Sequence, residues 1–306
     1  MHNEMTEMRT ARLAAGLWSG ITGHLVPFGT SASSVFGVRA NGITHFLRLT
    51  KRSFRSLEDV RDEMAFLAHL HVCGVRVAMP VPSIDGRVAE EVNDYVAALF
   101  QRARGFYVEP GRYWTEALFR EWGRAMARQH DASCTFRFPS GGWRQNWRQE
   151  PVLVEGLTRI QAADIELSRV ADKLLTELQT HAGVLGEVGA IHADIAPQNF
   201  RYEPQSGITA FDFDNCCRHW FLYDLAVSMS VLRLRSQREQ LVRWIIEGYQ
   251  ELRLLPGEPV LFGLLLRLRL LYVYCDRLYS FGTAPGSEQM NTLRDLRERL
   301  IRGKAW

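Results

Sequence analysis

Ile191-His192-Ala193-Asp194-Ile195-Ala196-Pro197-Gln198-Asn199 is the stretch that decides how this chain is interpreted. Asp194 precedes Asn199 by five residues, and His192 precedes Asp194 by two. Pro197 lies inside the stretch and cannot donate a backbone hydrogen bond, which favours a loop over a helix. The stretch therefore predicts a loop that carries an acid, an amide and an imidazole.

A second stretch, Ile208-Thr209-Ala210-Phe211-Asp212-Phe213-Asp214, begins seventeen residues after the start of the first. Its apolar residues predict a strand, and a carboxylate in such a setting is costly unless it is paired or binds a metal ion. Asp212 follows Asn199 by thirteen residues, with a turn that contains Gly207 between them. A short hairpin would bring Asp212 back beside Asn199.

The order of Asp194, Asn199 and Asp212 matches what phosphoryl transfer requires of a protein. That reaction depends on positioning and on cations close to the developing charge, and Mg²⁺ prefers oxygen ligands. The pattern HxDxxxxN is that of a kinase catalytic loop. We therefore expect Asp194 to accept the proton of an acceptor hydroxyl, and Asn199 and Asp212 to bind Mg²⁺. The alternative, in which the two acids only cap turns, explains neither Asn199 nor the order of elements.

Three further polar residues near these stretches are expected to support the site. We expect His192 to orient the loop through backbone groups rather than to act as a base. Asp214 could assist metal binding or brace the loop, and bracing is favoured. Asp224, in Tyr223-Asp224-Leu225-Ala226, opens a predicted helix and is expected to cap it or to tie down the loop.

A cation for the α- and β-phosphates is expected on the strand Phe46-Leu47-Arg48-Leu49. Side chains alternate across a strand, so Arg48 points to the face opposite Leu47 and Leu49. Arginine can bind phosphate in a bidentate manner, and Glu63 in the following helix is its expected partner. The alternative is an ordinary surface arginine on a strand.

Two more segments are expected to contact the nucleotide. Gly29-Thr30-Ser31-Ala32-Ser33-Ser34 precedes a strand, and its backbone N–H groups could cradle phosphates. The segment Phe100-Gln101-Arg102 follows another predicted strand and should bind the adenine edge through backbone groups. The nucleotide-binding candidates are thus Arg48, Glu63, Ser31, Ser33, Phe100 and Gln101.

The character of the chain changes near residue 100, from short β-like segments to helices. We expect a small β-rich lobe over residues 1–100 and a larger helical lobe over residues 101–306, which is an α+β fold with the site in the cleft. Strands are predicted at 35–38, 43–49 and 94–100, hairpins around Asn41-Gly42 and over 84–88, and a helix from Ser56 to Gly74. Further helices are predicted near 114–130, 163–181, 222–235, 237–252, 259–281 and 287–302.

Composition limits the classes of partner. The net charge of +3, from 37 basic and 34 acidic residues, gives no indication of nucleic-acid binding. Five cysteines without a CxxC spacing favour a reduced, cytoplasmic compartment. The apolar run Pro259–Gly282 contains Arg267, Arg269, Asp276 and Arg277, so we expect a buried helix rather than a membrane span.

The two stretches and Tyr223-Asp224-Leu225-Ala226 together resemble the aminoglycoside phosphotransferase superfamily. That superfamily includes choline kinase, homoserine kinase-like proteins and RdoA-type kinases. The likeness extends to Leu47-Arg48-Leu49, to Glu63 and to the link from Gly74 to Pro82. It implies a protein-kinase-like bilobal fold, ATP and Mg²⁺, with Asp194 as the catalytic aspartate and Asn199 and Asp212 as metal ligands. Arg48 stands where many members carry Lys, and Ala193 where Gly is usual.

The phosphate acceptor is expected in front of Asp194, against the helical lobe. Candidate segments are Trp143-Arg144-Gln145-Asn146-Trp147-Arg148 and the helix with Arg267, Arg269, Tyr272, Tyr274, Asp276 and Arg277. Either these residues form a pocket for a small alcohol, or the aromatic residues are core and the arginines are solvated. A small-molecule alcohol kinase is the leading hypothesis. The alternatives are a protein Ser/Thr kinase of RdoA type, a non-catalytic nucleotide-binding regulator and, more distantly, a metallohydrolase. The sequence gives no indication of the oligomeric state.

Overall fold

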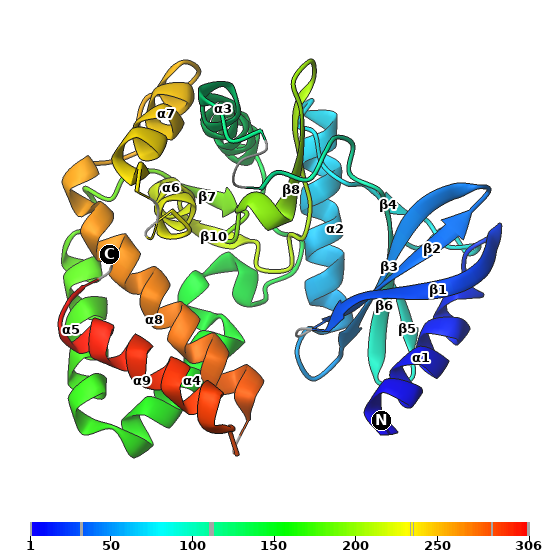
Figure 1. Cartoon of the computed structure of the whole chain (residues 1–306), viewed down its shortest axis with the longest axis horizontal. Coiled ribbons are helices and arrows are strands. Elements are labelled where there is room, and N and C mark those ends of the chain that lie inside the picture. The colour runs from blue at the N-terminus through cyan, green and yellow to red at the C-terminus, as the bar shows by residue number, and fades with distance from the viewer. Residues whose placement is uncertain are drawn as a thin grey trace.

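The fold is taken from a computed structural model of the 306-residue chain. It describes residues 2–30, 33–109, 113–232, 234, 236–282 and 284–304. The expected Ser31 lies outside these ranges. Figure 1 shows a β-rich lobe beside a larger lobe of helices.

The β-rich lobe is built on one antiparallel sheet in the order β1-β2-β3-β6-β4, with β5 also paired to β6. The strands are β1 (Ile21–Thr30), β2 (Ser33–Ala40), β3 (Ile43–Lys51), β4 (Pro80–Val81), β5 (Glu90–Val92) and β6 (Tyr95–Gln101). The predicted turn at Asn41-Gly42 joins β2 to β3, and both residues have positive φ, as a two-residue hairpin requires. The hairpin expected over 84–88 is wrong: these residues form only a turn, because β4 and β5 each pair with β6 instead of with one another.

Each face of this sheet is covered by a different helix. Leu47 and Leu49 pack with residues of α1 (His2–Ala15), whereas Arg48 faces α2 (Leu57–Val72). Figure 1 shows α2 between the sheet and the helical lobe, with α1 on the outer side. The sequence did not predict α1, because the residues it buries include small alanines such as Ala11 and Ala14. The face of the sheet that carries Arg48 therefore borders the cleft between the lobes.

The position of α2 follows from local signals at both of its ends. Ser56 accepts the N–H of Asp59, and the side chain of Asp59 returns to the N–H of Ser56, which completes a capping box. The chain leaves the helix through Gly74, whose φ of +79° suits glycine. Glu63 lies in the buried middle of the helix.

The helical lobe contains α3 (Glu116–Ser133), α4 (Pro151–Ala163), α5 (Ile165–Thr180), α6 (Phe221–Ser230), α7 (Arg238–Gln250), α8 (Phe262–Phe281) and α9 (Ser287–Ile301). Four short strands form two pairs, β7 (Val188–Ile191) with β10 (Cys217–Trp220) and β8 (Phe200–Glu203) with β9 (Gly207–Ala210). The 3-10 turns are Trp143–Gln145, Trp147–Gln149, Pro197–Asn199 and Pro259–Leu261. Of these helices, α4 was not predicted.

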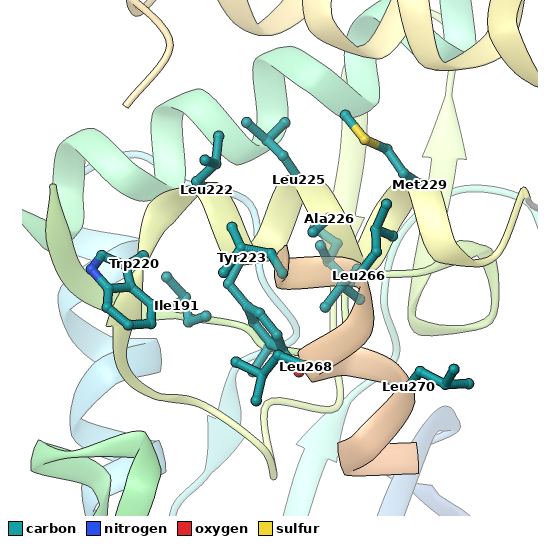
Figure 2. Close-up of a cluster of buried hydrophobic side chains, with 14 of the residues drawn as sticks. Ile191, Trp220, Leu222, Tyr223, Leu225, Ala226, Met229, Leu266, Leu268 and Leu270 are labelled. Atoms are coloured by element: carbon teal, nitrogen blue, oxygen red, sulfur yellow. The ribbon is translucent and has the colours of Figure 1, made fainter. Parts of the chain in front are cut away.

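The core of the helical lobe holds α6 and α8 together. Figure 2 shows Leu266 of α8 near Ala226 and Met229 of α6, and Leu268 near Tyr223. On another side of α8, Gly156 of α4 lies so close to Cys275 that a Cβ at Gly156 would meet the Cys275 Cβ at 2.3 Å. This close packing fixes α8 relative to the segments that carry the two sequence motifs.

Within the part of the chain that the structure describes, no helix combines the length and apolarity that a membrane crossing requires. The predicted helix over 259–281 is instead a 3-10 turn followed by α8, and residues such as Leu265 and Leu271 are fully buried in the protein core.

Asp164 offers a test of this packing, because it caps α5 and pairs with α9. Its Oδ1 accepts the N–H of Leu167 at 3.0 Å, and Arg297 donates to its Oδ2 at 2.5 Å. We expect Asp164→Ala to lower the free energy of unfolding by about 1–2 kcal/mol, the usual cost of losing an N-cap. Asp172→Ala, an exposed position on the same helix, is the matched control. Chemical denaturation at pH 7 measures both.

The same substitution has a defined pH dependence. The hydrogen bond from Arg297 holds the pKa of Asp164 below its ordinary value. For an acid with a depressed pKa, the stabilisation is present above the unfolded-state pKa and is lost as pH falls through the folded-state pKa. The difference between wild type and Asp164→Ala should therefore shrink in acid, and a difference that grows in acid would contradict this account.

Candidate active site

The loop after β7 is held by one buried carboxylate. Asp224, in the first turn of α6, accepts the N–H of His192 at 3.0 Å and the N–H of Ala193 at 2.7 Å. Gln129 and His130 of α3 contact the same carboxylate at 3.4 and 3.3 Å. Ala193 has a φ of +64°, a left-handed conformation that is uncommon for a residue other than glycine. The loop therefore has one defined path, with Asp194 at its tip.

His192 is buried, and its contacts are with backbone groups. Its Nδ1 accepts the N–H of Asp194 at 3.3 Å, so Nε2 carries the proton and donates to the carbonyl of Phe211 at 3.1 Å. Its ring also packs against Phe213. With both nitrogens engaged, His192 joins the two motif segments and has neither a free nitrogen for a metal ion nor one for a proton.

The carboxylate of Asp194 is contacted from two sides. Asn199 donates its Nδ2 to Asp194 Oδ2 and to the Asp194 carbonyl, both at 2.9 Å. Arg269 of α8 donates its Nη2 to Asp194 Oδ1 at 2.5 Å. Because the Nδ2 of Asn199 faces Asp194, its Oδ1 lies on the opposite side of the amide. The side chain of Asp194 keeps 22% of its surface exposed, so the carboxylate is accessible as well as oriented.

The predicted hairpin places Asp212 beside this loop. β8 pairs with β9, and the N–H of Phe211 donates to the carbonyl of Asn199 at 3.0 Å. The strand expected over 208–214 is shorter, since β9 ends at Ala210; Asp212 lies beyond it with a φ of +66°, which is not a strand conformation, and its side chain is 52% exposed. Its Oδ1 lies 3.9 Å from Arg48 Nη1 across the cleft.

The environment of Asp212 disfavours its ionised form. Although the carboxylate opens on to the cleft, surrounding protein atoms limit its hydration, and this burial, with the charges of Asp214, Asp194 and Glu63, raises its pKa to about 7. Arg48 opposes this increase in pKa. A carboxylate crowded by other carboxylates is a favourable ligand for a divalent cation, which would offset the repulsion.

Arg48 and Glu63 form a buried bidentate ion pair. Arg48 Nη1 donates to Glu63 Oε1 at 2.9 Å, and Nη2 donates to Oε2 at 2.5 Å. The guanidinium group also lies 5.0 Å from the ring centre of Phe100. Both side chains are at least 94% buried, which is not the environment of a surface arginine.

The helix that carries Glu63 is also held by the other lobe. Asp62 accepts the N–H of Ser140 at 3.0 Å and its hydroxyl at 2.5 Å. Phe66 packs against Phe213, which lies between the two acids of the second motif. These contacts fix the distance between Glu63 and the segment that carries Asp212.

Asp214 is surrounded by arginines. Arg55 Nε lies 3.6 Å from its Oδ1, and Arg144 donates to its backbone carbonyl at 3.0 Å. Burial opposes ionisation, but Arg55, Arg48 and Arg144 outweigh it and hold the pKa of Asp214 below its ordinary value. These contacts are those of a residue that braces the loop.

The remaining nucleotide candidates occupy the edges of the cleft. Ser33 opens β2, and its hydroxyl is 3.0 Å from the Thr50 hydroxyl on β3. The N–H of Gln101 donates to the carbonyl of Met79 at 2.8 Å, so this N–H is engaged within the protein. Phe100 has its backbone between β3 and β4 and directs its ring toward Arg48.

Sequence reasoning missed several polar residues that shape the site. Arg269 was only one candidate on an apolar helix, and Arg144 was expected to be either part of a pocket or solvated. Arg144 is fully buried and donates to backbone carbonyls of Asp214 and Cys216, whereas Arg269 keeps 13% of its side chain exposed. Arg55 and Glu150, a fully buried pair with an N···O distance of 3.0 Å, were not singled out. For Arg269, the sequence signal was a charged residue inside the apolar run Pro259–Gly282.

The site geometry can be set against known proteins. The profile of the phosphotransferase enzyme family matches residues 24–255. Amicoumacin kinase of Bacillus subtilis is 28% identical over 278 residues, which cover 85% of this chain and 81% of that protein. Homoserine kinase of Sinorhizobium medicae is 28% identical over 244 residues, which cover 74% and 70%.

Solved structures show the same architecture. An amicoumacin kinase in complex with AMP-PNP, Ca²⁺ and Ami superposes with a TM-score of 0.86 at 22% identity, covering 99% of this chain and 96% of that one. A choline kinase from Streptococcus pneumoniae superposes with a TM-score of 0.65 at 12% identity, covering 98% of each chain. The protein-kinase-like bilobal fold is thus confirmed. The resemblance drawn from the motifs is confirmed as well, and the chain belongs to the phosphotransferase enzyme family.

Proposed function

We propose that this protein transfers the γ-phosphoryl group of ATP to a hydroxyl group of a small molecule. The observation that carries the proposal is the assembly of Asp194, Asn199 and Asp212 beneath the Arg48–Glu63 pair. Asp194 would then serve the acceptor hydroxyl, and Asn199 and Asp212 would bind the metal ion. Arg48 would supply a fixed positive charge for the phosphates of the nucleotide.

Asp194 is proposed as the catalytic residue. The acceptor hydroxyl would donate a hydrogen bond to an Asp194 oxygen and lose its proton to it as the oxygen attacks the γ-phosphorus. The bond between that phosphorus and the bridging oxygen breaks, and ADP leaves. The hydrogen bond from Asn199 and the ion pair with Arg269 orient the carboxylate for this role.

Asn199 and Asp212 are proposed to hold Mg²⁺. One amide oxygen and one carboxylate oxygen form the hard donor set that Mg²⁺ accepts together with water and phosphate oxygens. The raised pKa of Asp212 supports the assignment, because a cation would stabilise the ionised form. When bound, the cation neutralises charge on the phosphates. Both ring nitrogens of His192 are engaged elsewhere, which does not favour a metallohydrolase.

The cleft face of the sheet is proposed to bind the nucleotide. Arg48 would contact the α- and β-phosphates, with Glu63 holding it in place. Phe46 lies two residues before Arg48 on the same face of β3, and Phe28 of β1 packs edge-on against it with ring centres 5.2 Å apart. Phe28 is 63% exposed, which leaves aromatic surface for a purine. The carbonyl of Gln101 is the proposed contact for the adenine edge.

The acceptor is proposed to be an alcohol that also carries an amine. Tyr272 and Asp276 follow Arg269 on α8 at spacings that place all three on one helix face. Burial raises the pKa of Asp276, with Asp194 adding to the increase and Arg277 and Arg269 opposing it. An ammonium group beside Asp276 would favour its ionised form. Relatives named for homoserine and aminopropanol act on molecules of this class.

The proposed compartment is the cytoplasm, because ATP is the proposed phosphate donor and all five cysteines are free thiols.

Asp194→Asn tests the central assignment. It keeps the size of the side chain but removes the proton acceptor, so we expect at least about a 100-fold loss of phosphoryl transfer. Binding of AMP-PNP should stay within a few-fold of wild type. Transfer from labelled ATP to a panel of alcohols and amino alcohols measures the loss, with Asp172→Asn as the control. An Asp194→Asn protein that retains wild-type turnover would end the proposal.

Asp276→Asn tests the acceptor class. We expect it to raise KM for aminopropanol by about tenfold, the order expected when a charge-assisted contact is lost, and to leave KM for ATP unchanged. Propanol, which lacks the amine, should be a poor acceptor for both proteins. Asp295→Asn, an exposed change on α9, is the control. Equal kcat/KM values of wild type for aminopropanol and propanol would contradict the proposal that the acceptor carries an amine.

The raised pKa of Asp212 leads to a prediction about how divalent-cation binding depends on pH. Because its pKa is about 7, protons compete with the cation below that pH, and cation affinity should rise as pH increases through 7. Titration with Mn²⁺ in the presence of AMP-PNP, at pH 6 and pH 8, measures the dependence. Asp212→Asn should weaken binding and remove most of the pH dependence. An unchanged dependence in this variant would assign the titration to another group.

A further inference from the structure

We propose that Arg269 is a positioning residue that holds the Asp194 carboxylate in its reactive orientation. The inference deepens the proposed function and rests on it. Arg269 lies 75 residues from Asp194 in the sequence and reaches it from a different element, α8.

The first argument is that two different side chains donate hydrogen bonds to the two oxygens of the Asp194 carboxylate. Asn199 donates to Oδ2 at 2.9 Å, whereas Arg269 donates to Oδ1 at 2.5 Å. A carboxylate held through only one oxygen can rotate about its bond to Cβ, but donors on both oxygens remove that freedom. Arg269 also places its Nη1 3.4 Å from the carbonyl of Ala193. One guanidinium group thus contacts the side chain of Asp194 and the backbone just before it.

The second argument is the rigidity of Arg269 itself. Its side chain is only 13% exposed, and its guanidinium group lies 5.7 Å from the ring centre of Tyr272. Tyr223 extends from α6 toward Leu268 of α8 in Figure 2, and the charge of Arg269 opposes the increase in the pKa of Tyr223 that burial causes. The close contact of Gly156 with Cys275 fixes α8 on another side. A donor on a fixed scaffold orients its partner more tightly than one on a free side chain.

The third argument is energetic. An ion pair whose side chains are 13% and 22% exposed contributes little net stability, because desolvation and screening by solvent offset the attraction between the charges. Arg267, two residues earlier on the same helix, pairs with Glu177 of α5 at 3.2 Å. Arg269 instead contacts the residue that acts on the acceptor. The two arginines therefore form a matched pair, one at the site and one away from it.

The shape of the guanidinium group matters for this role. Its two terminal nitrogens reach Asp194 Oδ1 and the Ala193 carbonyl at once. The ammonium group of lysine is a single point on a flexible stem and cannot reproduce this fork. Arg269→Lys should therefore retain only part of the activity.

Arg269→Ala and Arg267→Ala provide the experiment. The probe is turnover of Mg-ATP with aminopropanol as acceptor, or with water as acceptor. We expect Arg269→Ala to lower kcat by about 10- to 100-fold, the scale for a misplaced catalytic group, while KM for ATP stays within about twofold. Arg267→Ala should resemble wild type. Millimolar guanidinium, far below denaturing concentrations, should restore part of the activity of Arg269→Ala but not that of Asp194→Asn.

The outcomes separate this inference from the proposed function. If wild type shows no turnover that depends on Asp194, the proposed function and the role of Arg269 are both overturned. If wild type turns over but Arg269→Ala equals Arg267→Ala, only the role of Arg269 is overturned. A loss of kcat that guanidinium does not restore, accompanied by a lower Tm, would assign Arg269 a purely structural role. If Arg269→Ala does not fold, Arg269→Lys and Arg269→Gln serve instead, and activity in the order Arg, Lys, Gln supports the inference whereas equal activity overturns it.

Discussion

The site depends on the buried carboxylate of Asp224. A fully buried acid is tolerated only when hydrogen bonds satisfy it, and Asp224 receives the N–H groups of His192 and Ala193. The neighbouring His130 has its pKa lowered by burial, so it approaches the carboxylate as a neutral group. The backbone before Asp194 therefore carries the main stabilisation of this charge. Displacing the loop would leave Asp224 with only the longer contacts to Gln129 and His130, and this is why Asp194 has a fixed place.

The two lobes are joined by charged residues that are almost free of solvent. Arg55, from the loop before α2, pairs with Glu150 of the helical lobe and lies against Asp214. Arg144 donates to carbonyl groups of the segment after Asp214 and of α2. Breaking any one of these contacts would strand a buried charge. The Arg48–Glu63 pair and the Asp194 loop are consequently held at one separation, so both sides of the proposed reaction are in place together.

Local patterns predicted much of this arrangement because the relevant contacts are close in sequence. The turn at Gly207 returns Asp212 to Asn199 within a single hairpin, and a capping box at Ser56 starts the helix that carries Glu63. Strand alternation placed Arg48 on the correct face. The helices α1 and α4 carry weaker signals, since α1 buries small alanines and the cap of α4 is Glu150, which is not among the usual N-cap residues. The segment 84–88 shows the opposite error, since its hairpin pattern is overridden by the pairing of its neighbours with β6.

By itself, the sequence determined the order of the elements, the polar residues of the loop that carries Asp194 and the family resemblance, because spacing and alternation along the chain encode them. Only the tertiary structure decided which arginine meets Asp194 and which acids are braced by arginine. Arg267 and Arg269 look alike in the sequence, yet one faces Glu177 and the other Asp194. Their difference arises from the rotation of α8 against its neighbours, which is set by packing across the whole lobe and is not written in any local pattern.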